Sequence, residues 1–150
     1  MTTVRSARVA GASPLLICGL RDSAQVEATV STIIDCCGKA AGRAGRVTIT
    51  PSAGDHCWAP ADLDRIVAAV CPVLSAGDRV LIHCSSGRSR SATAAAAVLL
   101  AMGLAATPDL ALAATTLEPG PSGRARTAPH RRAVQSLRAW WGARQHGPPG

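Results

Sequence analysis

The stretch that decides the fold is residues 79–91, which read Arg-Val-Leu-Ile-His-Cys-Ser-Ser-Gly-Arg-Ser-Arg-Ser. Its apolar beginning, residues 79–83, predicts a buried strand. A glycine-containing loop at 84–90 follows, and the alanine-rich residues 91–102 are predicted as a helix. Strand–loop–helix units build α/β proteins, whose ligands bind beyond the carboxyl ends of the strands. Chemistry is therefore expected at this turn.

Strands and helices alternate on both sides of this unit. Strands are predicted at 15–20, 30–37 and 46–50, and helices at 21–28, 62–74, 108–117 and in a C-terminal segment where Val134, Leu137 and Trp141 share a face. Residues 51–60 and 118–127 have the composition of loops. This order predicts an α/β fold with a mainly parallel central sheet flanked by helices.

Length and composition indicate one globular domain. The chain has 150 residues, of which 47% are hydrophobic and 17% charged, so it can bury a core and is too apolar for a disordered segment. We expect the domain at 14–145, with flexible termini at 1–13 and 146–150. The net charge of +7 indicates either a solvated basic surface or an anionic partner. With three Trp and no Phe or Tyr, no nucleic-acid partner is expected.

Membrane insertion and secretion are not indicated. The most apolar stretch, residues 92–106, is too short to cross a bilayer, so we expect a buried helix and no integral membrane segment. Residues 1–14 lack the hydrophobic core of a signal peptide. The six cysteines include no C-x-x-C pair of the kind found in zinc sites and redox motifs. We therefore expect a cytoplasmic protein.

The loop at 84–90 has the properties of an anion-binding and nucleophilic site. Loop amides and a helix N-terminus that surround one concavity suit a tetrahedral oxyanion, and their positive field favours the thiolate form of Cys84. Arg90 offers a planar fork that can bind two phosphate oxygens. The residues expected to bind the anion are Ser85, Ser86, Gly87, Arg88, Ser89 and Arg90.

Two neighbouring residues are expected to support the nucleophile. The Ser91 hydroxyl can donate a hydrogen bond to the sulfur and help it to leave as a thiolate. His83 is expected to hold the loop through hydrogen bonds and not to act as a base. The alternative is a purely structural arrangement, in which a buried cysteine lies beside a helix N-terminus with capping serines.

Residues 83–91 resemble the H-C-x-x-G-x-x-R-S signature of the cysteine-dependent protein tyrosine phosphatase superfamily. The short chain and the apolar residues before the signature resemble the dual-specificity branch. Weaker similarity covers residues 14–141: 16–20 resemble the family's opening strand, 33–37 its V-I-N-L-C strand, and 119–141 its closing loop and helix. Glu118 stands where that branch usually has Arg.

The resemblance implies a phosphatase-type strand–phosphate loop–helix core and a two-step reaction. Cys84 would attack phosphorus to form a phosphocysteine, while Arg90 and the loop amides bind the equatorial oxygens. An aspartic acid would protonate the leaving oxygen and then activate the water that hydrolyses the intermediate. No metal and no other cofactor is implied.

Asp55 is the candidate general acid. It precedes Cys84 by 29 residues and lies in a Gly/Pro-containing loop after a strand, as the acid of the family does. Asp62 is the alternative, although its place at a helix start is better explained by capping. In the same loop, His56 is either a simple loop residue or a substrate contact, and Trp58 either lines the pocket or anchors the loop.

The implied substrate is a phosphorylated protein, with phosphotyrosine first and phosphoserine or phosphothreonine as further targets. A phosphoinositide is the second candidate substrate, because Arg88 adds positive charge to the loop. However, relatives that act on phosphoinositides usually carry a second basic residue directly after the cysteine, and here that position is Ser85. A pseudophosphatase that only binds phosphorylated ligands is a third, and the full set of catalytic residues argues against it. A rhodanese-like sulfurtransferase fits the signature less well.

The resemblance also implies a redox partner for the nucleophile. Within residues 33–37, Cys37 occupies the position that some relatives use for a disulfide with the oxidised nucleophile. Neighbouring strand residues face opposite sides, so at most one of Cys36 and Cys37 can point towards Cys84. The alternative is that both are ordinary core cysteines.

Overall fold

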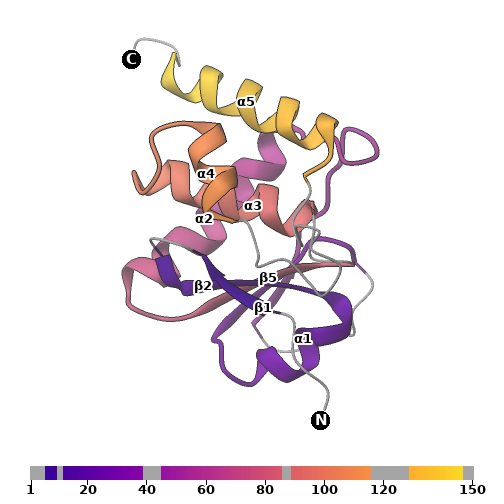
Figure 1. The fold of residues 1–150 in the computed structure, drawn as a ribbon. Coiled ribbons are helices and arrows are strands. Elements are labelled where there is room, and N and C mark those ends of the chain that lie inside the picture. The colour runs from indigo at the N-terminus through magenta and orange to yellow at the C-terminus, as the bar shows by residue number, and fades with distance from the viewer. Residues whose placement is uncertain (1–5, 10–11, 39–44, 86–88, 116–128, 147–150) are drawn as a thin grey trace.

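A computed structural model describes residues 6–9, 12–38, 45–85, 89–115 and 129–146 (Figure 1). The elements are β1 Ser6–Val9, β2 Ala12–Gly19, α1 Leu20–Glu27, β3 Thr32–Asp35, β4 Arg46–Thr48, α2 Pro60–Ser75, β5 Val80–Cys84, α3 Arg90–Ala101, α4 Pro108–Ala114 and α5 Arg131–Gln145.

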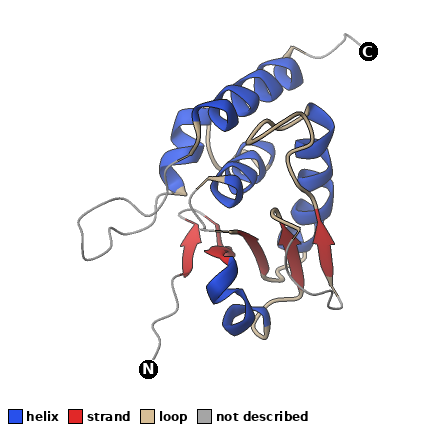
Figure 2. Cartoon of the chain, turned by 90° about the vertical axis from the view of Figure 1, so that its right-hand side faces the viewer, coloured by secondary structure: helices blue, strands red, loops and turns tan. Residues whose placement is uncertain are grey.

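The centre of the fold is a five-stranded sheet in the order β1-β2-β5-β3-β4. The pairs β2–β5, β5–β3 and β3–β4 are parallel, and β1 alone pairs antiparallel, with β2. Helices α2 to α5 cover one face of the sheet and α1 lies on the other (Figures 1 and 2). The expected α/β fold with a mainly parallel, helix-flanked sheet is confirmed.

Part of the N-terminal segment that we expected to be flexible is a strand. Residues 6–9 form β1, which pairs along β2 from Ser6 opposite Cys18, with a register shift between Arg8 and Val9. An edge strand is paired on one side only, so it does not need the apolar run that marks a central strand. The prediction for residues 1–13 was wrong here for that reason.

Side chains alternate between two cores across the sheet. The larger core packs β2, β3 and β5 against α2, α3 and α5 and includes Leu15, Ile17, Ile34, Val80, Ile82 and Leu63. The smaller core lies under α1 and contains Leu16, Cys18, Val26, Ile33 and Leu81. Because both faces of the parallel strands are covered, these strands are apolar at nearly every position.

Helix α3 lies at the centre of the larger core. All ten of its residues from Ser91 to Leu100 are buried, and it contacts the sheet and helices α2, α4 and α5. The expectation of a buried helix in this apolar stretch is confirmed. Over the ranges that the structure describes, no helix combines the length and apolarity needed to span a bilayer. The N-terminus of α3 faces the carboxyl end of β5.

One helix face differs from the sequence-based expectation. The buried residues of α5 are Ala133, Leu137 and Trp140, whereas Trp141 is only partly buried. The Trp140 indole nitrogen donates a hydrogen bond to Asp64 of α2 at 2.9 Å, which fixes α5 against α2. Both sets of residues fit helical spacing, and packing selects the one that includes Trp140.

We expect Gly45→Ala to destabilise the fold much more than Gly77→Ala. Both glycines have a positive φ (+83° and +87°), but a Cβ at Gly45 would lie 2.7 Å from the Ser31 carbonyl oxygen, whereas Gly77 has open space around it. The strain of the left-handed conformation is about 1 kcal/mol in both variants, and the clash raises the loss for Gly45→Ala to about 3 kcal/mol. Urea unfolding measures the difference, and equal losses would contradict it.

Candidate active site

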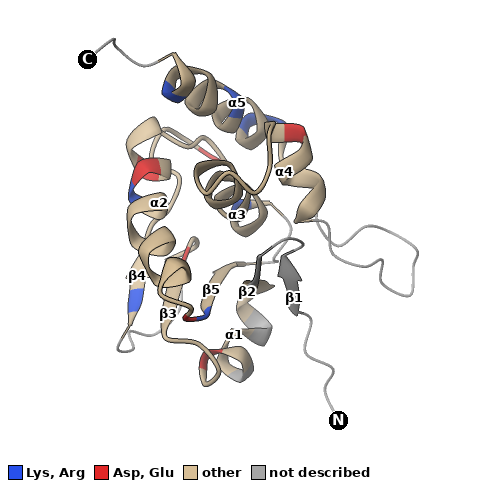
Figure 3. Cartoon of the chain, turned by 90° about the vertical axis from the view of Figure 1, so that its left-hand side faces the viewer, with Lys and Arg blue, Asp and Glu red and all other residues tan. Residues whose placement is uncertain are grey.

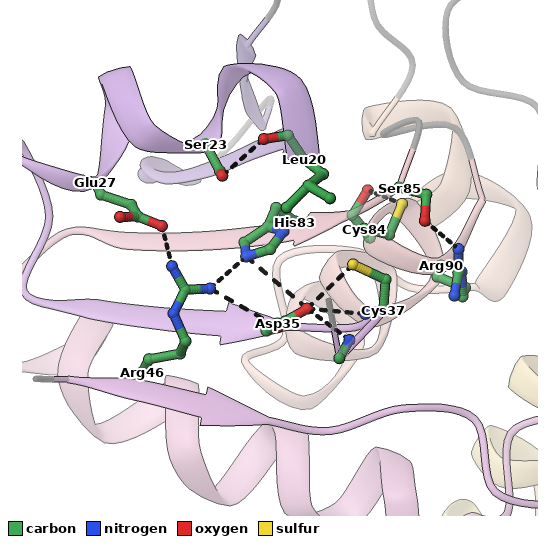
Figure 4. A network of polar contacts seen from close by, with 12 residues as sticks. Leu20, Ser23, Glu27, Asp35, Cys37, Arg46, His83, Cys84, Ser85 and Arg90 are labelled. Carbon is green, nitrogen blue, oxygen red and sulfur yellow. Dashed lines mark hydrogen bonds and ion pairs between the residues drawn. The ribbon is translucent and has the colours of Figure 1, made fainter. Parts of the chain in front are cut away.

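The sequence-predicted nucleophile and anion-binding arginine meet at one edge of the sheet. Cys84 is the last residue of β5 and is 1% exposed; its thiol lies 3.3 Å from the Ser91 hydroxyl and points towards it as donor. Arg90 opens α3, and its Nη2 donates to the Ser85 hydroxyl at 3.0 Å (Figure 4). The end of β5 and the start of α3 lie close together in space. Four candidate residues therefore surround the same point: Cys84, Ser85, Arg90 and Ser91.

The loop at 84–90, the predicted phosphate loop, is described only at its two ends. Ser86, Gly87 and Arg88 lie outside the described residues, so their role as anion ligands stays a prediction. At the first end, the Ser85 carbonyl oxygen accepts a hydrogen bond from the Leu20 amide at 3.1 Å. At the second end, the Ser89 hydroxyl accepts one from the His130 amide at 2.8 Å, so this hydroxyl already connects the loop to the start of α5.

His83 lies behind the nucleophile, fully buried on the opposite face of β5. Its Nε2 lies 2.7 Å from Nη1 of Arg46. An arginine can only donate, so Nε2 must accept and the ring proton is on Nδ1. Burial lowers the pKa of His83, and this outweighs the opposite effect of Asp35, so the ring is neutral at neutral pH. A neutral, fixed ring agrees with a supporting role.

A buried network of charges holds His83 in place (Figure 4). The Arg46 guanidinium contacts the Glu27 carboxylate and lies 3.9 Å from Asp35, and all three side chains are less than a tenth exposed. Burial acts to raise the pKa of Asp35, but hydrogen bonds from the Cys37 and Gly38 amides outweigh it and hold that pKa below its ordinary value. The carboxylate therefore stays charged.

Sequence reasoning did not find this network. The sequence places Arg46 and Asp35 in predicted strands and indicates no further role for them. One signal was present: Asp35 and His83 are polar residues at the ends of two apolar strands, and the structure pairs them in register. Two polar residues at the same level of a buried sheet need a common partner, which Arg46 provides.

The network also contains the one group of potential metal ligands among the residues that the structure describes. Ligand atoms of Asp35, Cys37 and His83 lie within 4.8 Å of one another. However, the Arg46 guanidinium is 2.7 Å from the His83 Nε2 and uses the lone pair that a metal ion would need. We therefore interpret the group as an ion-pair network and not as a metal site.

The two candidate acids differ in their surroundings. Asp62 is 4% exposed, and its carboxylate accepts hydrogen bonds from the Ala59 amide at 2.8 Å and the Ser52 amide at 2.9 Å. It is thus a capping residue of α2 that also holds the preceding loop. Asp55 lies exposed in that loop, between β4 and α2. Exposure leaves Asp55 accessible to a substrate, whereas Asp62 is committed to structural bonds.

Trp58 anchors the loop between β4 and α2, called the acid loop below because it carries Asp55, to the larger core. Its side chain is 3% exposed and belongs to the larger core, and its amide donates to the Ser136 hydroxyl of α5 at 3.1 Å. The neighbouring His56 stacks its ring on His130, which precedes α5. The loop is therefore fastened to α5 at two places.

Cys36, and not Cys37, is the neighbour of the nucleophile. The pairing of β3 with β5 ends at Asp35 opposite His83, and one residue further Cys36 enters the same core as Cys84. Burial, and next the proximity of Cys84, raise the pKa of the Cys36 thiol well above its ordinary value. Cys37 faces the other way, where its thiol donates to Asp35 at 3.3 Å.

The fold recurs in solved structures over nearly the whole chain. A variant of human DUSP28 matches 95% of this chain and 98% of its own with a TM-score of 0.75 and 23% identity. PTPMT1 matches 95% and 99% with a TM-score of 0.72 and 18% identity. The Yvh1 phosphatase domain from Chaetomium thermophilum matches 95% and 98% with a TM-score of 0.68 and 20% identity.

The chain has the dual-specificity phosphatase fold. No protein-family model matches it, and no curated protein matches its sequence. The low identities explain why the resemblance in sequence is specific only around Cys84, although the dual-specificity phosphatase fold covers nearly all of the chain.

The positions of the cysteines lead to a prediction about peroxide. Oxidation of the Cys84 thiolate gives a sulfenic acid, which a neighbouring thiol attacks to form a disulfide with loss of water. Adjacent strands lie about 4.8 Å apart, a Cα separation that a disulfide can bridge, so Cys36 is the expected partner. In Cys36→Ser the sulfenic acid has no partner thiol, so excess peroxide oxidises it to the sulfinic acid, which thiols do not reduce. After excess peroxide and then dithiothreitol, the wild type and Cys37→Ser should regain activity, whereas Cys36→Ser should not.

Peptide mapping by mass spectrometry identifies the disulfide directly. A Cys36–Cys84 link is expected in the oxidised wild type. A Cys37–Cys84 link, or equal recovery of the two serine variants, would contradict the assignment.

Proposed function

We propose that this chain is a phosphatase that forms a phosphocysteine on Cys84. The observation that carries the proposal is the position of the Cys84 sulfur, which lies at the end of β5, next to the N-terminus of α3 and 3.3 Å from the Ser91 hydroxyl. A helix N-terminus stabilises a thiolate and binds phosphate oxygens. The same place therefore suits both the nucleophile and its target.

The first step is transfer of the phosphoryl group to sulfur. The Cys84 thiolate attacks phosphorus while the ester oxygen leaves, and Asp55 gives that oxygen a proton. Arg90, which bonds to Ser85 in this structure, would turn its guanidinium to two of the equatorial oxygens. Its place in the first turn of α3 gives it a short path to them.

The second step returns the thiolate. Asp55, now a carboxylate, removes a proton from a water molecule that attacks phosphorus, and inorganic phosphate leaves. The Ser91 hydroxyl donates to the departing sulfur and stabilises its negative charge. His83 and its charge network lie on the far face of β5, where they fix the strand end and take no proton.

We propose phosphorylated proteins as the substrates, with phosphotyrosine first and phosphoserine or phosphothreonine as further targets. A cysteine nucleophile on a basic protein suits an anionic substrate; basic residues lie along α5 (Figure 3), and Arg131 and Arg132 are exposed in its first turn. A thiolate nucleophile also requires a reducing compartment, so the proposed location is inside the cell.

A phosphoinositide is the second candidate substrate. PTPMT1 has been solved in complex with PI(5)P, and that structure matches 94% of this chain with a TM-score of 0.71 and 16% identity. Arg88 would add a positive charge to the loop in either case. A pseudophosphatase that only binds its ligand is less well supported, because Cys84, Arg90 and Asp55 are all present.

A substrate panel tests the proposal. Wild type and Cys84→Ser are assayed on p-nitrophenyl phosphate, phosphotyrosyl and phosphoseryl peptides, and phosphoinositide vesicles. We expect hydrolysis by the wild type, fastest on the phosphotyrosyl peptide, and none by Cys84→Ser, which should still bind inorganic phosphate. Hydrolysis by Cys84→Ser near the wild-type rate would refute the nucleophile. Preference for the vesicles would replace the protein substrate by the lipid.

The two aspartates provide a matched pair of variants. Asp55→Asn should lower kcat/KM by roughly 10²–10⁴-fold for substrates with poor leaving groups, and far less for p-nitrophenyl phosphate, because only a poor leaving group needs the proton. Asp62→Asn should leave kcat/KM nearly unchanged and lower the free energy of unfolding by about 1 kcal/mol. If the rate falls in Asp62→Asn and not in Asp55→Asn, the two roles must be exchanged.

A further inference from the structure

A pair of stacked histidines joins the acid loop to the start of α5. The rings of His56 and His130 lie 4.6 Å apart between centroids and are nearly parallel, with 8° between their planes. The two residues are distant in the sequence, and neither ring belongs to the main core. Stacked aromatic rings at this separation attract each other, so the contact is a cross-link between two segments that carry no regular hydrogen-bonded pairing.

The backbone of His56 is strained. Its φ is +57°, and it is the one non-glycine residue with a positive φ among the residues that the structure describes. A residue with a Cβ adopts this conformation at a cost, and the surrounding contacts must hold it there. Asp55 is the adjacent residue, and both lie in the turn that the Cys57 amide closes on the Gly54 carbonyl oxygen at 3.0 Å.

His130 continues the connection to the phosphate loop. It is the N-cap of α5, with its Nδ1 accepting a hydrogen bond from the Arg132 amide at 3.1 Å. Its own amide donates to the Ser89 hydroxyl at 2.8 Å, and Ser89 directly precedes Arg90. A single residue thus contacts the acid loop through its ring and the phosphate loop through its main chain.

The loop has a second attachment, on its other side. The Trp58 amide donates to the Ser136 hydroxyl at 3.1 Å, and that hydroxyl donates to the Arg132 carbonyl oxygen at 2.8 Å. This attachment fixes the end of the loop that leads into α2. Around Asp55 the backbone forms a turn, in which the Ala53 amide donates to the Cys57 carbonyl oxygen at 3.1 Å, and the histidine stack fixes this turn against the start of α5.

The charges around the stack favour a neutral His56 ring. Burial lowers the pKa of His56, and His130, Arg90 and Arg132 lower it further, against the opposite effect of Asp55. A proton on His56 would add a positive charge close to Arg90 and Arg132, so the His56 ring is uncharged at neutral pH. A neutral His56 ring stacks on His130 without repulsion between like charges.

We propose that His56 and His130 form a clasp that sets the orientation of Asp55 relative to Arg90 and Cys84. The inference rests on the proposed function, because it assigns the clasp to the proton transfer by Asp55. Both histidines are positioning residues that act through Asp55. Loss of the clasp should therefore weaken protonation of the leaving group and leave the binding of phosphate intact.

Asparagine variants remove the rings and keep the backbone. Asparagine tolerates a positive φ, as His56 requires, and it is a good N-cap, as His130 requires. The variants are His56→Asn, His130→Asn and the double variant, with His146→Asn at the far end of α5 as the control. For each we measure kcat/KM on phenyl phosphate and on p-nitrophenyl phosphate, and inhibition by inorganic phosphate.

We expect kcat/KM on phenyl phosphate to fall about three- to tenfold in each single variant, the range that loss of an aromatic pair allows. On p-nitrophenyl phosphate it should be nearly unchanged, and the inhibition constant of phosphate should not move, which also shows that the variants are folded. The double variant should lose no more than either single one, because one contact is broken in all three. His56→Phe keeps a ring and should restore most of the rate.

Asp55→Asn separates the two possible failures. If Asp55→Asn hydrolyses phenyl phosphate as fast as the wild type, the acid assignment fails and the clasp fails with it. If Asp55→Asn is slow while both asparagine variants match the His146→Asn control, the acid stands and the clasp alone is overturned. The clasp is equally overturned if the losses at the two histidines multiply in the double variant, or if His56→Phe is as slow as His56→Asn.

Discussion

The last two residues of β5 must face opposite sides of the sheet, and the whole site depends on this alternation. Cys84 enters the larger core beside the N-terminus of α3, whereas His83 enters the smaller core under α1. Two consecutive residues of β5 therefore lie in different environments, one in the larger core and one in the smaller core. On one side a thiol can meet an anion, and on the other a rigid set of charges has no access to it.

The charges under α1 are unusual because they are nearly excluded from water. Arg46, Glu27 and Asp35 are each less than a tenth exposed, and burial of charges is costly unless every one of them is paired. Such a group resists rearrangement, since moving any member leaves another unpaired in a low-dielectric interior. It gives the strand end a stiffness that apolar side chains, which can slide past one another, do not provide.

The sequence predicted the parts of the fold that local patterns determine. An apolar run and an alanine-rich segment on either side of a glycine-containing loop sufficed for β5 and α3. The rest depends on three-dimensional neighbours: the charge of Arg46 was indistinguishable from a surface charge, and Trp140 and Trp141 fit helical spacing equally well. The position of Cys36 beside Cys84 required the register of two strands, which no single strand reveals.

The middle of helix α3 carries only small side chains. From Ala94 to Ala97 every side chain is a single methyl group and every one is buried, so the helix presents almost no ridges to the grooves of its neighbours. Small side chains let neighbouring elements approach a helix closely, so α3 can pack against the sheet and against α2, α4 and α5 at the same time. The consequence is a central helix whose first residue, Arg90, is held close to the carboxyl end of β5 by packing on every side.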